Sequence, residues 1–339
     1  MPQNKRGKHS FVLNEMPVLT AWASVAGKKE SEGPLAHRID YTSRDTYFGC
    51  KTWEQAEKQM QTKALSILLT KAGLRENQVG AVCSGDLLNQ CIGSSFTLRN
   101  KGISHLGLYG ACSTMAESLL LASMTVCGGF SDRVVAMTSS HFAASERQYR
   151  FPLGYGGQRT PTAQWTVTGS GAVLVCSAGK GPRIRSCTIG TVVDLGITDA
   201  NNMGAAMAPA AYDTIRNHME DLGAQPEDYD RIFTGDLGQI GKEALLELAR
   251  LDGVSLGGQL EDCGTWIFDR QAQDVHAGGS GCGCSAVVLC SDLLHKLHTG
   301  VWKRILFCGT GALLSPTSTQ QGLPIPGVCH AVEIIGGTD

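Results

Sequence analysis

The chain has 339 residues, of which 42% are hydrophobic and 18% are charged, a composition typical of a compact folded protein and not of a disordered one. Its net charge of −2, from 29 basic and 31 acidic residues, leaves no basic excess for phosphates and argues against nucleic-acid binding as the main role. No apolar run approaches the roughly 20 residues that span a bilayer, so we expect a soluble chain, at most peripheral to a membrane.

The first ten residues, MPQNKRGKHS, are basic and predict a solvated tail. No apolar run of the length of a signal peptide follows them, so we expect no secretory signal. The 13 cysteines are scattered, many of them in apolar runs such as VLVCS and ILFCG. This usage is typical of buried thiols in a reducing compartment and not of a disulfide framework.

The first half of the chain alternates helical and strand patterns. Residues 52–74 predict an amphipathic helix that stops near Gly73, and residues 79–88 predict a short strand. A second helix is expected from Ser113 to Val126, followed by a strand at residues 133–140. This order favours a layered α/β fold.

The second half repeats this pattern. Residues 214–239, TIRNHMEDLGAQPEDYDRIFTGDLGQ, correspond to residues 64–89, ALSILLTKAGLRENQVGAVCSGDLLN, at an offset of 150 positions. A second pair of strands, DRVVAMTSS and KRILFCGTG, lies 171 positions apart. Two pairs of similar segments in the same order indicate an internal duplication, although chance similarity of short strands is the alternative. A duplicated unit places its site where the halves meet.

Cys112 in GLYGACSTMAESLLLA is the first candidate for chemistry, because it falls where a helix begins. Unpaired backbone N–H groups and the positive end of the helix dipole lower the pKa of a thiol there, and they also bind anions. The alternative is one more buried small cysteine.

The glycine-rich segment DVHAGGSGCGCSAVVLC is the second candidate, because so much glycine indicates a close backbone approach. Cys282 and Cys284 lack two further ligands for zinc, so we expect no metal. The alternative for His276 is a hydrogen-bonded structural histidine. For Asp236 and its counterpart Asp86, the alternative is that the carboxylate caps a turn.

The stretch HFAASERQYRFPLGYGGQRTPTAQW predicts a long irregular segment with three arginines, Arg147, Arg150 and Arg159. Such segments often form lids or partner surfaces, and guanidinium groups bind carboxylates. The alternative is a solvated or dimer-facing excursion.

These pieces together resemble the thiolase superfamily. GACSTMAESLLLA resembles the start of the nucleophile helix in the ketoacyl synthases, and TAQWTVTGSGAVLV and RILFCGTGALLSP resemble two of their strands. ERQYRFP, PTAQWTVTGSGA and HAGGSGCGCSA resemble, more narrowly, the stage V sporulation protein AD family of spore-forming bacteria. The resemblance implies an α/β thiolase fold in which two duplicated βαβαβαββ halves form a five-layer αβαβα arrangement. The expected divisions are 1–38 (tail and first strand), 39–178 and 179–339.

The chain also departs from the condensing enzymes. Those enzymes need a thiolate, a histidine, and a second histidine or an asparagine. In the alignment that the resemblance implies, the first histidine falls on GDLGQ, at Asp236, and the asparagine position falls near Ser280. We therefore expect acyl condensation to fail although Cys112 remains as a vestigial nucleophile.

The family resemblance implies a non-catalytic protein that binds dipicolinic acid (pyridine-2,6-dicarboxylate), free or as its calcium chelate, for its movement into and out of the spore. It further implies a homodimer that acts as a soluble subunit beside stage V sporulation membrane proteins at the spore inner membrane, with no cofactor. Asp236 could be protonated, accept from the thiol, or help to hold calcium. The expected ligand-binding residues are Cys112, Asp236, His276, Gly278, Gly279, Ser280, Arg150 and Thr310.

Two other functions stay open. In the first, the protein is an acyltransferase or condensing enzyme in which Cys112 is acylated and His276 acts as the base. In the second, it is a scaffold whose pocket has lost its function.

Overall fold

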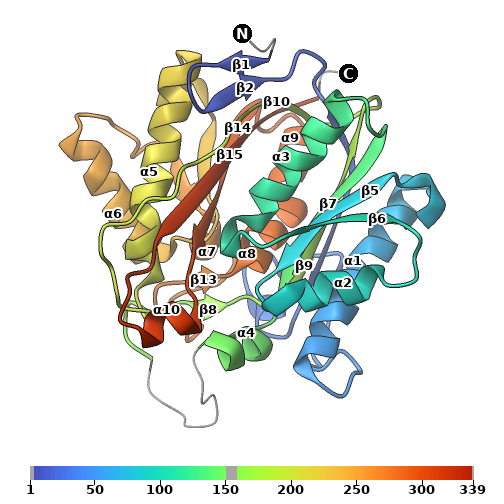
Figure 1. The fold of residues 1–339 in the computed structure, drawn as a ribbon, viewed down its shortest axis with the longest axis horizontal. Helices are drawn as coiled ribbons and strands as arrows, with labels where there is room; N and C mark the ends of the chain where they lie inside the picture. The colour runs from blue at the N-terminus through green and yellow to red at the C-terminus, as the bar shows by residue number, and fades with distance from the viewer. Residues whose placement is uncertain (1–3, 150–158, 338–339) are drawn as a thin grey trace.

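The computed structural model describes residues 4–149 and 159–337, and its centre is one large mixed sheet (Figure 1). The strand order is β12-β11-β14-β15-β10-β3-β9-β7-β5-β6. One series of strands comprises β3 (Val18–Ala26), β5 (Ala81–Asp86), β6 (Ser104–Leu108), β7 (Arg133–Ser140) and β9 (Gly169–Cys176). The other comprises β10 (Arg183–Thr188), β11 (Arg231–Thr234), β12 (Leu260–Asp262), β14 (Arg304–Ala312) and β15 (Gly327–Ile335).

The two series have the same internal order. When the strands are numbered along the chain within each series, both series run third, second, fourth, fifth, first from the outer edge of the sheet toward its middle. They meet where β3 pairs with β10, at Val18 and Arg183. The α/β prediction is confirmed by this mixed sheet and its helices, whereas the five-layer arrangement of duplicated halves stays a prediction.

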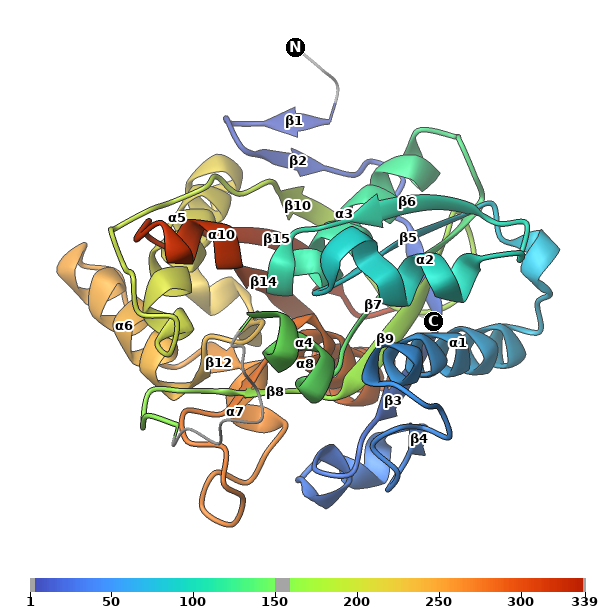
Figure 2. The same ribbon diagram turned by 60° about the horizontal axis from the view of Figure 1, so that its bottom comes forward.

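Figure 2 shows helices on both sides of the sheet, and the three larger hydrophobic clusters among the described residues lie between these helices and the strands. Helix α1 (Trp53–Ala72) packs on β3, β7 and β9, while α5 (Met203–Leu222) and α6 (Gly238–Leu251) pack together, with α5 on β14 and β15. Helices α3 (Thr114–Cys127) and α8 (Cys282–Val288) share the core between these groups. The starts of α3 and α8 are therefore brought together in the middle of the molecule.

Short elements complete the fold. They are β4 (Tyr41–Thr42), β8 (Trp165–Thr166), β13 (Gly279–Ser280), α2 (Ile92–Leu98), α4 (Phe142–Tyr149), α7 (Cys263–Trp266), α9 (Leu294–His298) and α10 (Pro316–Gln320). Strands β8 and β13 pair in parallel and form a separate two-stranded sheet.

The predicted first helix is confirmed. Thr52 caps α1 by accepting from the backbone N–H of Gln55, and Gly73 ends the helix in the left-handed region at φ 63°. Helix α5 has the same length and ends at Gly223, at φ 62°. Glycine adopts this conformation at little cost, which is why both helices stop there.

Among the described residues, Lys5 to Lys8 are exposed, as their charge predicted, but they belong to an ordered hairpin and not to a frayed tail. Strands β1 (Lys5–Arg6) and β2 (Ser10–Val12) form a hairpin, and β2 pairs with β10. The Asp221 carboxylate accepts hydrogen bonds from the backbone N–H groups of His9 and Ser10 at 2.8 and 2.9 Å. A partner more than 200 positions away in the chain gives no local signal, so composition alone could not predict this hairpin.

In the part of the chain that the structure describes, no helix is long and apolar enough to cross a bilayer. All 13 cysteines are free, and only Cys50 and Cys127 are more than slightly exposed.

Candidate functional site

Cys112 lies in a 3₁₀ turn, Ala111–Ser113, that leads directly into α3. Ala111 has φ 51°, so the turn enters the helix through an unusual backbone conformation. The Cys112 side chain is buried, with 6% of its surface exposed, and packs against Leu87 and Cys282.

Asp236, two residues after the end of β11, is the centre of the site. Its carboxylate accepts from Thr310 Oγ1 at 2.8 Å, from the Gly281 backbone N–H at 2.8 Å and from Ser280 Oγ at 3.2 Å. The Cys112 thiol lies beside it and interacts with it electrostatically. Burial raises the pKa of Asp236, and its hydrogen-bonding partners partly oppose that rise. Four of the predicted site residues therefore meet at one carboxylate.

Two further side chains hold the backbone around Asp236. Gln164 Nε2 donates to the carbonyls of Asp236 and Gly279 at 2.6 and 2.7 Å. The Asp262 carboxylate accepts from the N–H groups of Leu237 and Gly238 at 2.8 and 3.0 Å. The sequence analysis singled out neither residue as part of the site, although Gln164 lies within the motif PTAQWTVTGSGA.

A small cavity of about 50 Å³ lies beside Cys112. Ser280 forms part of its wall, and Tyr149 and Glu146 of α4 form another part. Tyr149 donates to the Leu87 carbonyl, which places its ring at the edge of the cavity. The full lining is Leu87, Ala111, Cys112, Ser145, Glu146, Tyr149, Thr166, Met203, Ser280, Ala312 and Leu314.

The other predicted site residues lie elsewhere. The His276 imidazole does not line this cavity and contacts Asp274, with Nε2 3.1 Å from the carboxylate. Gly278 has φ 117°, and a Cβ there would come 2.6 Å from the Gly264 carbonyl oxygen. Gly279 is buried, and a Cβ on it would meet Ile267 at 2.8 Å. Close packing thus explains both glycines, against the Gly264 backbone at Gly278 and against neighbouring side chains at Gly279. Arg150 lies outside the described residues.

The segment after β7 is less irregular than predicted. Residues Phe142–Tyr149 form α4, and the helical spacing of this short stretch is obscured by its polar composition. Two of the three arginines are already paired: Arg147 contacts Glu54 and lies over the Trp53 ring, while Arg159 contacts Asp274 at 2.9 Å.

The prediction that the start of α3 lowers the pKa of the Cys112 thiol is wrong. Burial raises this pKa well above its ordinary value, and the nearby Asp236 carboxylate adds to the rise. Removal from water and a negative neighbour both disfavour a thiolate, and together they outweigh the helix dipole.

We therefore expect iodoacetamide at pH 7.5 to leave Cys112 unmodified in the folded protein, because the thiolate is the reactive form. The half-buried Cys50 should be modified first. Peptide mass spectrometry gives the extent at each site, and labelling in denaturant shows that the Cys112 peptide is detectable. Rapid labelling of Cys112 in the folded protein would contradict the assigned burial and pairing.

This geometry is better suited to binding than to acyl transfer. When it is ionised, the Asp236 carboxylate only accepts hydrogen bonds, and in that form it cannot stabilise a developing oxyanion. Among the described residues, no imidazole or side-chain amide lines the cavity. Likewise, no cluster of three potential metal ligands occurs among the described residues.

Comparisons with known proteins agree with the sequence motifs. The family model described as stage V sporulation protein AD matches residues 7–335. The chain is 43% identical over 326 residues to "Stage V sporulation protein AD" of Bacillus subtilis (strain 168), covering 96% of each protein.

Solved structures show the same fold at low identity. A variant of OleA from Xanthomonas campestris superposes with a TM-score of 0.62 at 15% identity, covering 96% of this chain and 99% of that one. Human mitochondrial 3-ketoacyl-CoA thiolase gives 0.59 at 11% identity, with coverages of 96% and 99%. The 3-oxoacyl-[acyl-carrier-protein] synthase III of Aquifex aeolicus gives 0.56 at 13% identity, with coverages of 94% and 99%.

Proposed function

The chain belongs to the stage V sporulation protein AD family, and on that basis we propose that it binds dipicolinic acid without transforming it, in the cavity beside Cys112. It is a sporulation protein with a thiolase-like fold. The observation that supports the non-catalytic proposal is the buried Asp236 carboxylate beside Cys112, at the position of a catalytic base. Burial and this neighbouring carboxylate raise the pKa of the thiol and favour its protonated form.

Dipicolinate is a planar dianion of about a dozen heavy atoms, for which micromolar affinity is reasonable in a pre-formed site. A cavity of about 50 Å³ is too small for its ring. Binding therefore requires a wall to move, and Tyr149 is the side chain whose displacement opens the space above Cys112. The start of α3 offers the positive end of a helix dipole to one carboxylate.

Calorimetric titration with dipicolinate and with its calcium chelate tests this proposal. We expect saturable binding to the wild-type protein, unchanged within about threefold in Cys112→Ala, because the sulfur forms no covalent bond. In Cys112→Trp the indole fills the cavity, and dipicolinate binding at this site should weaken by at least about tenfold. Equal affinity for picolinate, which has one carboxylate, would rule out recognition of two carboxylates.

Incubation with acyl-CoA separates binding from catalysis. An acyl group found on Cys112 by mass spectrometry would favour the transferase alternative, in which the thiol acts as a nucleophile. A scaffold with a vestigial pocket would show no rise in melting temperature with any of these ligands.

We propose further that the protein is a homodimer, and that it serves as a peripheral subunit of a membrane channel complex at the spore inner membrane. Strand β6 ends the strand order of the sheet, and Leu106 on it is 48% exposed. Phe96 and Tyr109 nearby in the chain are exposed to a similar degree. An unpaired apolar edge strand is a surface that a second copy can cover.

For the dimer, we expect Leu106→Lys to halve the mass measured by light scattering, because a charge on each copy would face its equivalent across the two-fold axis. Lys180→Glu, at an exposed position far along the chain, serves as the control. A monomeric wild-type protein at all concentrations would contradict the proposed dimer.

A further inference from the structure

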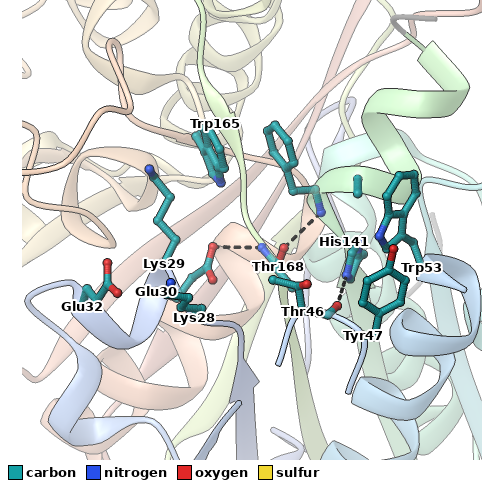
Figure 3. Close-up of a pocket in the computed structure, with 12 residues that line it drawn as sticks. Lys28, Lys29, Glu30, Glu32, Thr46, Tyr47, Trp53, His141, Trp165 and Thr168 are labelled. Carbon is teal, nitrogen blue, oxygen red and sulfur yellow. Dashed lines mark hydrogen bonds between the residues drawn. The ribbon is translucent and has the colours of Figure 1, made fainter. Parts of the chain in front are cut away.

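A second and much larger cavity lies beside Lys28, Lys29 and Trp165 (Figure 3). Its volume is about 550 Å³, against about 50 Å³ for the cavity beside Cys112. Phe142, at the start of α4, lines the large cavity, whereas Tyr149, at its end, lines the small one. The large cavity is in the size range of small-molecule sites.

Flat aromatic surfaces line this cavity. The rings of Phe142 and Trp165 stack with centroids 3.9 Å apart and planes 10° apart. Tyr47 and Trp53 form a second stacked pair, with centroids 6.1 Å apart. Their side chains come from separate segments but face one space, as the labelled Trp165, Trp53 and Tyr47 show in Figure 3. Such walls favour a planar ring.

The cavity also carries positive charge. Lys28 and Lys29 line it, and within the described ranges neither forms an ion pair with a carboxylate. Lys29 Nζ lies 4.1 Å from the centroid of the Trp165 ring. Two ammonium groups beside aromatic faces suit a ligand that is both flat and negatively charged. The lining also contains two acidic residues, Glu30 and Glu32.

Glu30 supplies an unused hydrogen-bonding atom. Its side chain is 1% exposed, and Oε1 accepts from the Thr168 backbone N–H at 3.0 Å. Oε2 is buried and has no partner. Burial raises the pKa of Glu30 to about 7, so near neutral pH a substantial fraction of this group is protonated and can donate. A buried polar atom without a partner is unusual and points to a missing one.

From these observations we propose that the cavity bounded by Lys28, Lys29, Glu30, Phe142 and Trp165 is a second binding site, for a planar aromatic carboxylate. The ring packs against the aromatic walls, and the carboxylate meets the lysine ammonium groups and the Glu30 O–H. The choice of dipicolinate as the probe rests on the proposed function. The site itself needs only one carboxylate, and this distinguishes it from the cavity beside Cys112.

The test uses full-length Cys112→Trp protein, in which the small cavity is filled, titrated with dipicolinate and with picolinate. We expect one equivalent of each to bind, accompanied by a change in tryptophan fluorescence. Adding Lys28→Glu and Lys29→Glu should weaken binding by at least about tenfold, because two attractive charges become repulsive. Adding Lys180→Glu, the same charge change at an exposed position, should leave binding unchanged. Melting curves confirm that each variant is folded.

The outcomes separate the two sites. Binding that is lost in the lysine variants but survives Cys112→Trp supports this second site, even if the cavity beside Cys112 binds nothing. No binding to Cys112→Trp, or binding that the lysine variants leave unchanged, overturns it. If Cys112→Trp binds nothing but the wild-type protein binds one equivalent, the proposed function still stands.

Discussion

Replacing Asp236 by alanine is expected to lower the free energy of unfolding by about 3 kcal/mol. Thr310, Ser280 and the Gly281 backbone N–H all donate to this carboxylate in a buried site. Removing it leaves those donors without an acceptor and without access to water. The hydroxyl groups can rotate to other acceptors, but the backbone N–H of Gly281 cannot.

Urea denaturation of wild-type and Asp236→Ala protein measures this change. Asp236→Asn retains the volume and one acceptor oxygen but turns an amide donor toward other donors, so we expect an intermediate loss. Glu227→Ala removes the same charge from an exposed position and should have an effect within about 0.5 kcal/mol. A stability of Asp236→Ala equal to wild type would show that the hydrogen bonds at this site contribute no net stability.

The second large effect is expected in the pH dependence of Glu30→Gln. The pKa of Glu30 is raised by burial from 4.5 to about 7 in the folded protein. Between these pH values the folded chain holds a proton that the unfolded chain has released, so the stability contributed by protonation is lost as pH rises through 7. The loss amounts to about 3 kcal/mol at alkaline pH. Gln does not titrate, so the variant should gain stability relative to wild type by about this amount from pH 5 to pH 8.

The comparison between the two proteins cancels the contributions of other buried groups. Burial lowers the pKa of His218 and His330 to about 4, and their effect has the opposite sign: stability rises with pH between about 4 and 6.5. Glu32→Gln, at an exposed neighbouring position, is the control. Parallel stability curves for Glu30→Gln and wild type would refute the raised pKa.

Much of the fold could be predicted because its signals are local. Strand β7 coincides with the predicted residues 133–140, and α1 ends at the predicted Gly73. The motif around Cys112 indicated the thiolase superfamily, and ERQYRFP, PTAQWTVTGSGA and HAGGSGCGCSA indicated the narrower family. The alignment placed Asp236 where a catalytic histidine stands in the enzymes. Thr310 and Ser280 followed from the same alignment.

The rest of the site depends on contacts between distant segments. The thiol pKa was predicted from the start of α3 alone, whereas burial and Asp236 decide it. Gln164 reaches Asp236 from 72 positions away. The large cavity gathers residues near 28, 47, 53, 141 and 165, and no spacing in the sequence relates them.

The pairing of β2 with β10 has a consequence for how the protein is made. Ser10 and Thr188 share a hydrogen bond across 178 positions, so the first strands leave the ribosome long before their partner exists. At about 5–20 residues per second, the delay is roughly 10–40 s. During that time the newly made amino-terminal hairpin has no β10 to pair with. When β2 pairs with β10, the start of the chain becomes attached to the half that is translated last.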